Sequence, residues 1–279
     1  MKQLESHKCY GGTLSVYEHR SVVLGCAMTF SVFLPAQSDD APVPFLTFLS
    51  GLTCTHDNFT TKGGAYGFAA QAGLAIIAPD TSPRGDNVPD DDAYDFGKGA
   101  GFYINATQGP WAAHYQMESY ITAELNALIC KHFPVSKERQ GIFGHSMGGH
   151  GALTLGLKYP VLFKSISALS PIVAPSQVPW GAKAFQGYLG ADEVTWQKHD
   201  ACALMEKADG RASFPEILID QGLGDDFLAT QLKPDLFEAA CAKSGQSLKL
   251  RLHEGYDHSY YFIQSFIGDH IAHHAKILA

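Results

Sequence analysis

The segment that most constrains this chain runs from Gly141 to Pro160 and reads GIFGHSMGGHGALTLGLKYP. A short apolar run ends in Gly-His-Ser-Met-Gly, residues 144–148, and a helix-like pattern begins near Gly149. A strand, a tight glycine-flanked turn and a helix in this order are typical of a nucleophile elbow, which presents a serine hydroxyl in a strained conformation. The alternative is a glycine-rich turn that only packs a helix closely on a sheet. The complete strand, turn and helix context favours Ser146 as a nucleophile.

Strand and helix patterns alternate along the rest of the chain. The first two strand-like stretches alternate apolar and polar residues, as a half-exposed antiparallel pair does, whereas residues 74–80 and 216–222 are short apolar runs typical of buried parallel strands. Helical periodicity covers residues 115–133 and 227–245, the latter ending in a glycine. The eight expected strands begin at Thr13, Met28, Pro44, Leu74, Gln140, Lys164, Glu216 and Ser247. This alternation predicts one α/β domain over residues 1–279, with a mostly parallel eight-stranded sheet and helices on both faces.

Charge and apolar content limit the classes of partner. Lys and Arg number 20 against 28 Asp and Glu, a net charge of −8, which argues against a protein that binds nucleic acid through a positive field. The chain begins without the apolar stretch of a signal peptide, and no run approaches the roughly 18 apolar residues of a membrane helix. The six cysteines form no C-x-x-C pair, which favours reduced thiols over disulfides or a zinc site. We therefore expect a soluble cytoplasmic protein that acts on a small molecule without a metal or other cofactor.

A serine is a useful nucleophile only beside a base that an acid orients. Folds with this type of elbow supply the groups in the order serine, acid, histidine, and here Asp220, Asp225 and Asp226 lie at or after the seventh expected strand and His258 follows the eighth. Parallel strands end at the same edge of a sheet, so these groups can converge on Ser146. Asp220 still lies within the strand pattern, and the pattern alone leaves Asp225 and Asp226 as equal candidates for the acid.

Other histidines fit a catalytic role less well than His258. His253 lies within an expected strand. His270, His273 and His274 share a face of the last helix at the spacing that zinc sites use, which would fit a metal-binding or chaperone-like module. We favour the ordinary polarity of a solvated helix face as the explanation of this tail.

An oxyanion formed at the serine needs two N–H donors. The residue after the nucleophile, Met147, supplies one of them, at the positive end of the helix dipole. The loop after the third expected strand, SGLTCTHDNF over residues 50–59, supplies the other. Leu52 and Thr53 are both candidates for this second donor.

Further segments carry a signal more specific than G-x-S-x-G alone. They are SGLTCT at Ser50, APDTSPRG at Ala78, DFGKGAGFY at Asp95, FGHSMGGHGAL at Phe143, PWGAKAFQGYLG at Pro179, DQG at Asp220 and EGYDHSYYF at Glu254. With these segments the chain resembles, nearly from end to end, the S-formylglutathione hydrolase or esterase D family. The resemblance implies an α/β-hydrolase fold, hydrolysis of S-formylglutathione to glutathione and formate in formaldehyde detoxification, a cytoplasmic location and a homodimer.

The resemblance also implies roles for individual residues. It assigns the nucleophile to Ser146, the base to His258, the acid to Asp225 and an oxyanion N–H to Leu52. A general short-chain carboxylesterase would use the same groups on small acyl esters and is the alternative function. Candidate substrate contacts are Cys54, whose thiol lies beside the active site in the family, Trp180, and Lys62 and Arg84 as partners for glutathione carboxylates.

Overall fold

The computed structural model, which describes residues 1–207 and 214–279, places its strands in one nine-stranded sheet. The order across the sheet is β1-β2-β3-β5-β4-β6-β7-β8-β9. The first three strands are antiparallel, β3 also pairs with β5 in antiparallel register, and the pairs from β5 to β9 are parallel. The strands are β1 Lys2–Cys9, β2 Gly12–Arg20, β3 Ala27–Leu34, β4 Val43–Leu49, β5 Ala75–Pro79, β6 Val135–His145, β7 Ser165–Leu169, β8 Ile217–Gly222 and β9 Leu248–His253.

The predicted fold class is confirmed, but the predicted number of strands was one too small. The missed strand is β1, residues KQLESHKC, which pairs with β2 at the edge of the sheet. Seven of its eight residues are exposed and the last is half-buried. A strand that buries neither face has no need of alternating apolar residues, so the pattern that marks strands in a sequence is missing here.

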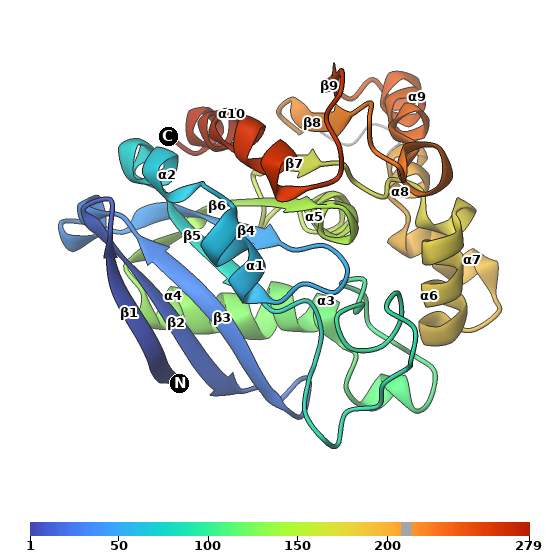
Figure 1. Ribbon diagram of the computed structural model, residues 1–279, viewed down its shortest axis with the longest axis horizontal. Coiled ribbons are helices and arrows are strands. Elements are labelled where there is room, and N and C mark those ends of the chain that lie inside the picture. The colour runs from blue at the N-terminus through green and yellow to red at the C-terminus, as the bar shows by residue number, and fades with distance from the viewer. Residues whose placement is uncertain (208–213) are drawn as a thin grey trace.

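Helices cover both faces of the sheet (Figure 1). The α-helices are α1 His56–Lys62, α2 Tyr66–Ala72, α3 Met117–Ser119, α4 Asn126–His132, α5 Met147–Lys158, α6 Pro179–Leu189, α7 Glu193–Trp196, α8 Ala201–Glu206, α9 Pro234–Ser244 and α10 Tyr260–Leu278. Two π-helical segments, η3 Tyr120–Leu125 and η6 Leu228–Leu232, and four 3-10 turns, η1 Ala36–Asp39, η2 Trp111–Ala113, η4 Pro175–Gln177 and η5 Gln197–His199, complete the elements. In the described ranges no helix combines the length and apolar character needed to span a bilayer.

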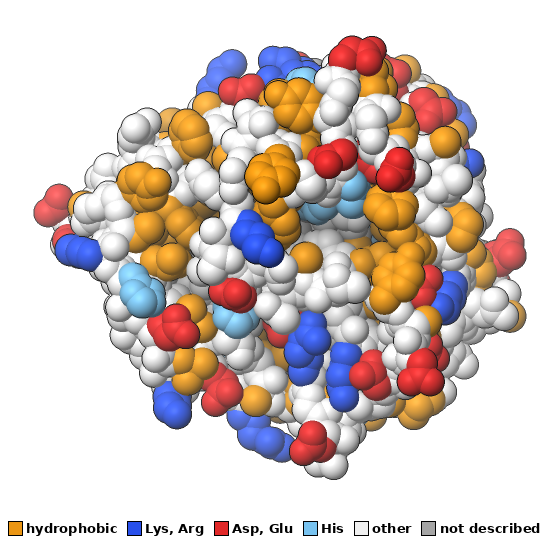
Figure 2. Space-filling view, viewed as in Figure 1, with side chains coloured by type: hydrophobic (Ala, Val, Ile, Leu, Met, Phe, Trp, Pro, Cys, Tyr) orange, Lys and Arg blue, Asp and Glu red, His pale blue; other side chains and the backbone are white. Residues whose placement is uncertain are grey.

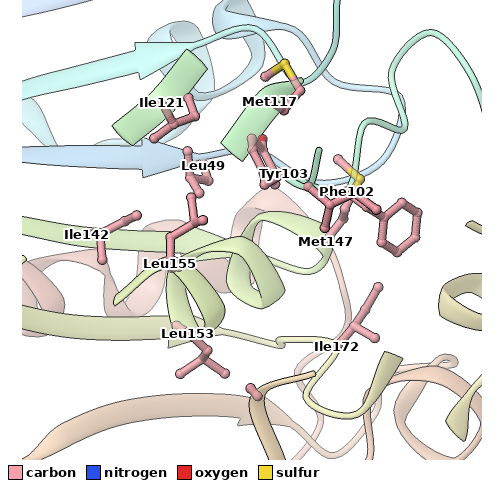
Figure 3. Packing of buried hydrophobic residues seen from close by; sticks show 14 of the residues in the cluster. Leu49, Phe102, Tyr103, Met117, Ile121, Ile142, Met147, Leu153, Leu155 and Ile172 are labelled. Carbon is pink, nitrogen blue, oxygen red and sulfur yellow. The ribbon is translucent and has the colours of Figure 1, made fainter. Parts of the chain in front are cut away.

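Two buried apolar clusters lie on opposite faces of the sheet. The smaller one joins β4 and β6 to α1, α2 and α10, with Phe48, Phe59 and Phe143 packed ring against ring. The larger one includes Leu49, Ile142 and Leu155, which lie close together between β4, β6 and α5 (Figure 3). Alternate residues of the same strands thus point into different clusters, and α5, which follows the elbow, is buried along almost all of its length.

The helix predicted over residues 227–245 is interrupted. A π-helical segment ends at Leu232, Lys233 has a left-handed conformation with φ 49°, and Pro234 begins α9. The reason is proline, which has no N–H for a helical hydrogen bond and disfavours the α conformation in the residue before it. The predicted end of the helix at Gly245 is confirmed by a left-handed C-cap with φ 74°.

Candidate active site

Ser146 lies at the junction of β6 and α5. Its backbone has φ 58° and ψ −119°, a conformation that a residue with a side chain adopts only where its surroundings enforce it. Its N–H donates to the carbonyl of Leu169 on the neighbouring strand β7 at 3.0 Å, and its carbonyl accepts from the N–H of His150 at 3.0 Å. These two hydrogen bonds anchor the turn to the sheet on one side and to the helix on the other.

The glycines around Ser146 are required by close backbone contact. A Cβ atom on Gly148 would overlap the carbonyl groups of Leu49 and Ser50, and one on Gly144 would overlap the carbonyl of Gly148. These obstacles are backbone atoms that cannot rotate away as a side chain can. The glycine-rich segment therefore lets α5 begin directly against the end of β4.

The structure brings His258 and Asp225 into direct contact. His258 follows β9, and its Nδ1–H donates to Asp225 Oδ2 at 2.6 Å. The side chain of Asp225 is fully buried, whereas Asp226 is exposed. Asp225 also accepts from the N–H of Phe227 at 2.9 Å and from the side-chain amide of Gln221 at 3.3 Å. Of the two aspartates that the pattern left open, only Asp225 therefore contacts the histidine.

The environment of Asp225 keeps it ionised. Burial by itself raises the pKa of a carboxyl group, but the hydrogen bond and charge of His258, with the N–H of Phe227 and the amide of Gln221, outweigh burial and hold the pKa of Asp225 below its usual range. An ionised carboxylate accepts from Nδ1–H and leaves Nε2 of the ring free to take a proton. This hydrogen bond gives the ring the orientation that a general base needs.

Ser146 and His258 line one cavity of about 270 Å³. On the face drawn in Figure 2, hydrophobic side chains border a hollow in which histidine atoms are visible. The lining comes from the loop after β4, the long loop after β5, the elbow, α6, the loop after β8, the loop after β9 and the start of α10. The lining residues are Gly51, Leu52, Thr53, Cys54, Tyr94, His145, Ser146, Trp180, Phe227, His258 and Tyr260.

The sequence predicts oxyanion donors at Met147 and in the loop after β4, and the hydrogen bonds of the described residues show which of these N–H groups are already used. Met147 is the first residue of α5, so its N–H is one of the helix donors that have no partner within the helix. The N–H of Thr53 already donates to the carbonyl of Gly99 at 2.9 Å. The N–H of Leu52 has no protein acceptor among residues 1–207 and 214–279. Of the two alternatives in this loop, Leu52 thus has the available donor.

The substrate contacts predicted from the sequence separate into two groups. Cys54 and Trp180 line the cavity, and burial raises the pKa of the Cys54 thiol. Lys62 is an exposed residue at the end of α1 and is not part of the lining. Arg84 is also outside the lining, and its guanidinium donates to the carboxylate of Asp80 and to the carbonyl of Cys54. The Nε and Nη2 donors of Arg84 are thus directed at the protein itself.

Four side chains of the lining, those of Tyr94, His145, Phe227 and Tyr260, were missed in the sequence. The Trp180 indole N–H donates to the hydroxyl of Tyr94 at 3.0 Å, and Phe227 lies between Trp180 and His258 with ring centroids 4.7 and 5.1 Å away. The ring of His145 lies 4.4 Å from that of His258. Three of them, His145, Phe227 and Tyr260, stand within two positions of a predicted catalytic residue, so proximity in the sequence was the available signal. Tyr94 belongs to the long loop and gave no such signal.

The explanation of the C-terminal histidines as a solvated face is wrong for two of them. His270 and His274 are fully buried. His274 contacts the hydroxyls of Ser165 and Ser167 at 2.6 and 2.9 Å, and His270 contacts Ser167 and Asp220 at 2.7 and 3.1 Å. Asp220, the aspartate within the strand, is thereby part of a buried structural network. In the part of the chain that is described, no three His, Cys, Asp or Glu residues are grouped so as to hold a metal ion.

Comparison with known proteins gives close relatives. The model of the Esterase family, described as "Putative esterase", matches residues 21–273. The S-formylglutathione hydrolase of Mus musculus is 54% identical over 280 aligned positions, which cover 100% of this chain and 99% of the relative, and that of Rattus norvegicus is 53% identical with the same coverage. A solved S-formylglutathione hydrolase structure from Agrobacterium tumefaciens has a TM-score of 0.97 at 50% identity, with both chains covered completely.

Proposed function

This chain belongs to the S-formylglutathione hydrolase family of esterases, and from that premise we propose that it hydrolyses S-formylglutathione to glutathione and formate. The observation that carries the proposal is geometric. Buried Asp225 holds His258 through a 2.6 Å hydrogen bond at a cavity that Ser146 also lines. A serine with a base and an orienting acid is the equipment for acyl transfer, and a thioester is an activated acyl donor.

In the first half of the reaction, Ser146 takes the formyl group. His258 Nε2 accepts the proton of the Ser146 hydroxyl while the oxygen attacks the formyl carbon. The resulting oxyanion accepts hydrogen bonds from the N–H groups of Leu52 and Met147. When the intermediate collapses, the carbon–sulfur bond breaks and glutathione leaves as a thiol, with the proton returned by His258. Asp225 stabilises the imidazolium that exists during these steps.

In the second half, water removes the formyl group. His258 takes a proton from a water molecule, whose oxygen attacks the carbon of the formyl ester on Ser146. The same two N–H groups stabilise the second oxyanion. The ester bond to Ser146 then breaks, formate leaves, and the serine recovers its proton from His258.

The cavity favours a small acyl group. Its volume is about 270 Å³, and the aromatic side chains of Tyr94, Trp180 and Phe227 form one wall. The hydrogen bond between Trp180 and Tyr94 holds this wall together. A formyl group fits such a space, whereas the tripeptide on the sulfur must extend through the opening to solvent.

A comparison of two substrates tests the proposal. The value of kcat/KM for S-formylglutathione is expected to exceed that for p-nitrophenyl acetate, because the tripeptide adds binding energy that the small ester lacks. Equal values, or a preference for the ester, would support the general short-chain carboxylesterase instead. p-Nitrophenyl butyrate is the matched probe of acyl size, and it should react more slowly than the acetate.

We also propose that residues 1–279 act as one α/β-hydrolase domain, as a homodimer in the cytoplasm. All nine strands of the described residues belong to one sheet, which supports a single domain. The family resemblance supports the homodimer and the location. Sedimentation equilibrium should give twice the chain mass of 30.2 kDa, and cell fractionation should recover the activity with the cytoplasmic proteins. A monomeric mass, or activity in another fraction, would overturn the corresponding part of the proposal.

A further inference from the structure

The turn that carries the Leu52 N–H is conformationally strained. Leu52 and Thr53 form its centre, and the closing hydrogen bond from the Cys54 N–H to the Gly51 carbonyl is long, at 3.4 Å. Thr53 has φ 67°, in the left-handed region that β-branched residues avoid. Such a conformation costs on the order of 1–3 kcal/mol and persists only where neighbouring groups enforce it. The turn therefore depends on contacts from outside its own segment.

Part of that support comes from the long loop that follows β5. Tyr103, which is fully buried, donates its hydroxyl hydrogen to the carbonyl of Ser50 at 2.8 Å. The N–H of Thr53 donates to the carbonyl of Gly99 at 2.9 Å. These bonds hold the entrance and the centre of the turn. The exit, at Cys54, is held by a different group.

The carbonyl of Cys54 receives the only charged donor that reaches this turn among the described residues. Arg84 Nη2 donates to it at 3.1 Å, and Arg84 Nε lies 3.0 Å from both carboxylate oxygens of Asp80. The Thr81 hydroxyl donates to the same carbonyl. The side chain of Asp80 is only 8% exposed, so the ion pair is shielded from solvent on that side. Hydrogen bonds from charged donors are roughly twice as strong as neutral ones.

Only a guanidinium can make both contacts of Arg84. Its planar fork directs one N–H toward Asp80 and another toward Cys54, whereas the ammonium of a lysine is a single point charge. We infer that Arg84 is a positioning residue: by holding the Cys54 carbonyl, it keeps the strained turn in the conformation that directs the Leu52 N–H at the oxyanion. This inference rests on the proposed acyl-transfer function. It replaces the expectation that Arg84 binds a carboxylate of glutathione.

The two roles predict different kinetics. A residue that aims an oxyanion donor acts only on the transition state, so its loss lowers kcat and leaves KM near the wild-type value. Loss of one such donor costs roughly 10²–10³ in turnover, and a displaced donor costs less. A residue that binds glutathione instead raises KM for S-formylglutathione and leaves the hydrolysis of p-nitrophenyl acetate unchanged.

The test is Arg84→Lys, which keeps the charge beside Asp80 but cannot also reach Cys54. We expect kcat to fall by roughly tenfold to a hundredfold for both S-formylglutathione and p-nitrophenyl acetate, with KM unchanged. The inhibition constant of a trifluoromethyl ketone, which forms a tetrahedral adduct with the serine, should rise by the same factor, while inhibition by glutathione stays constant. The matched control is Arg251→Lys, because Arg251 pairs with buried Asp220 far from this turn. This variant should leave kcat and the inhibition constant of the ketone unchanged.

A second variant covers the case in which Arg84→Lys does not fold. Thr81→Val removes the other side-chain donor to the Cys54 carbonyl, keeps the ion pair and should lower kcat in the same direction. The inference is overturned if both folded variants keep the wild-type kcat and ketone affinity, or if Arg84→Lys raises KM for S-formylglutathione alone. If the wild type hydrolyses p-nitrophenyl acetate but not S-formylglutathione, the proposed substrate is wrong. The role of Arg84 is then tested by the kcat of Arg84→Lys for p-nitrophenyl acetate.

Discussion

The substitution Asp225→Asn changes the hydrogen bonding of the proposed acid without changing its shape. The carboxylate accepts from three N–H groups, those of His258 at 2.6 Å, Phe227 at 2.9 Å and Gln221 at 3.3 Å. An amide has one oxygen and one NH2 group. If the oxygen faces His258, the NH2 group opposes the N–H of Phe227; if it faces Phe227, the NH2 group opposes Nδ1 and favours the wrong tautomer of His258.

The size of the effect follows from the 2.6 Å separation of His258 Nδ1 and Asp225 Oδ2. With an effective dielectric constant of about 20, two unit charges at that distance attract by roughly 6 kcal/mol. The proton that His258 takes from Ser146 places a positive charge beside this carboxylate in the transition state, so the attraction stabilises the transition state more than the bound substrate. Loss of the charge on Asp225 should therefore lower kcat by roughly 10⁴ and leave KM close to the wild-type value.

Steady-state kinetics with S-formylglutathione measure this effect, and Asp226→Asn is the matched control. Asp226→Asn is the same isosteric change at an adjacent, exposed position, and this variant should keep nearly full activity. Thermal melting of both variants checks that they are folded. Our reasoning about the acid would be refuted if Asp226→Asn lost as much activity as Asp225→Asn, or if Asp225→Asn kept a kcat near that of the wild type.

Three further predictions concern stability and the thiol. Gly148→Ala should lower the free energy of unfolding by about 3 kcal/mol, since its Cβ would overlap the carbonyl of Leu49. A variant that unfolds in urea at the same midpoint concentration as the wild type would contradict this. Because burial raises the pKa of Cys54, iodoacetamide should inactivate the wild type faster as the pH rises above neutral and should spare Cys54→Ser; equal inactivation of both proteins would show that Cys54 is not the sensitive thiol. Burial, helped by the charge of Lys158, lowers the pKa of His199 to about 4. The unfolded chain, with a histidine pKa of about 6.5, binds that proton first, so stability should fall as the pH drops from about 6.5 to 4, by up to roughly 1.4 kcal/mol per pH unit. His199→Gln should reduce the slope of the unfolding free energy against pH by the contribution of one proton, up to roughly 1.4 kcal/mol per pH unit. An unchanged slope would contradict this prediction.

The parts of the fold that bury apolar surface could be predicted from the sequence. The strands from β2 to β9 each bury at least part of one face, and apolar periodicity reports that burial directly. The edge strand β1 is polar on both sides and had no such signal. The break at Lys233 and Pro234 was visible as a proline, but the surrounding helical periodicity masked it.

The candidate site was predictable where function requires a residue at the end of a strand. Ser146 and His258 follow from that rule, because parallel strands bring their carboxyl ends to one edge. The choice between Asp225 and Asp226 depends on which side chain the loop turns inward, and a pattern of residue types does not contain that information. Asp80 lies only four residues from Arg84, but Cys54 and the partners of His270 lie far away in the sequence. Charge and spacing alone therefore predicted a ligand contact and a solvated face instead.

The most direct test of the proposed function is the release of products from S-formylglutathione by the wild type and by Ser146→Ala. Glutathione and formate are measured in the same samples, and thermal melting checks that the variant is folded. We predict that the wild type releases the two products in equal amounts and that Ser146→Ala lowers kcat by roughly 10⁶. Turnover by the folded variant near the wild-type rate, or no release of either product by the wild type, would contradict the proposal.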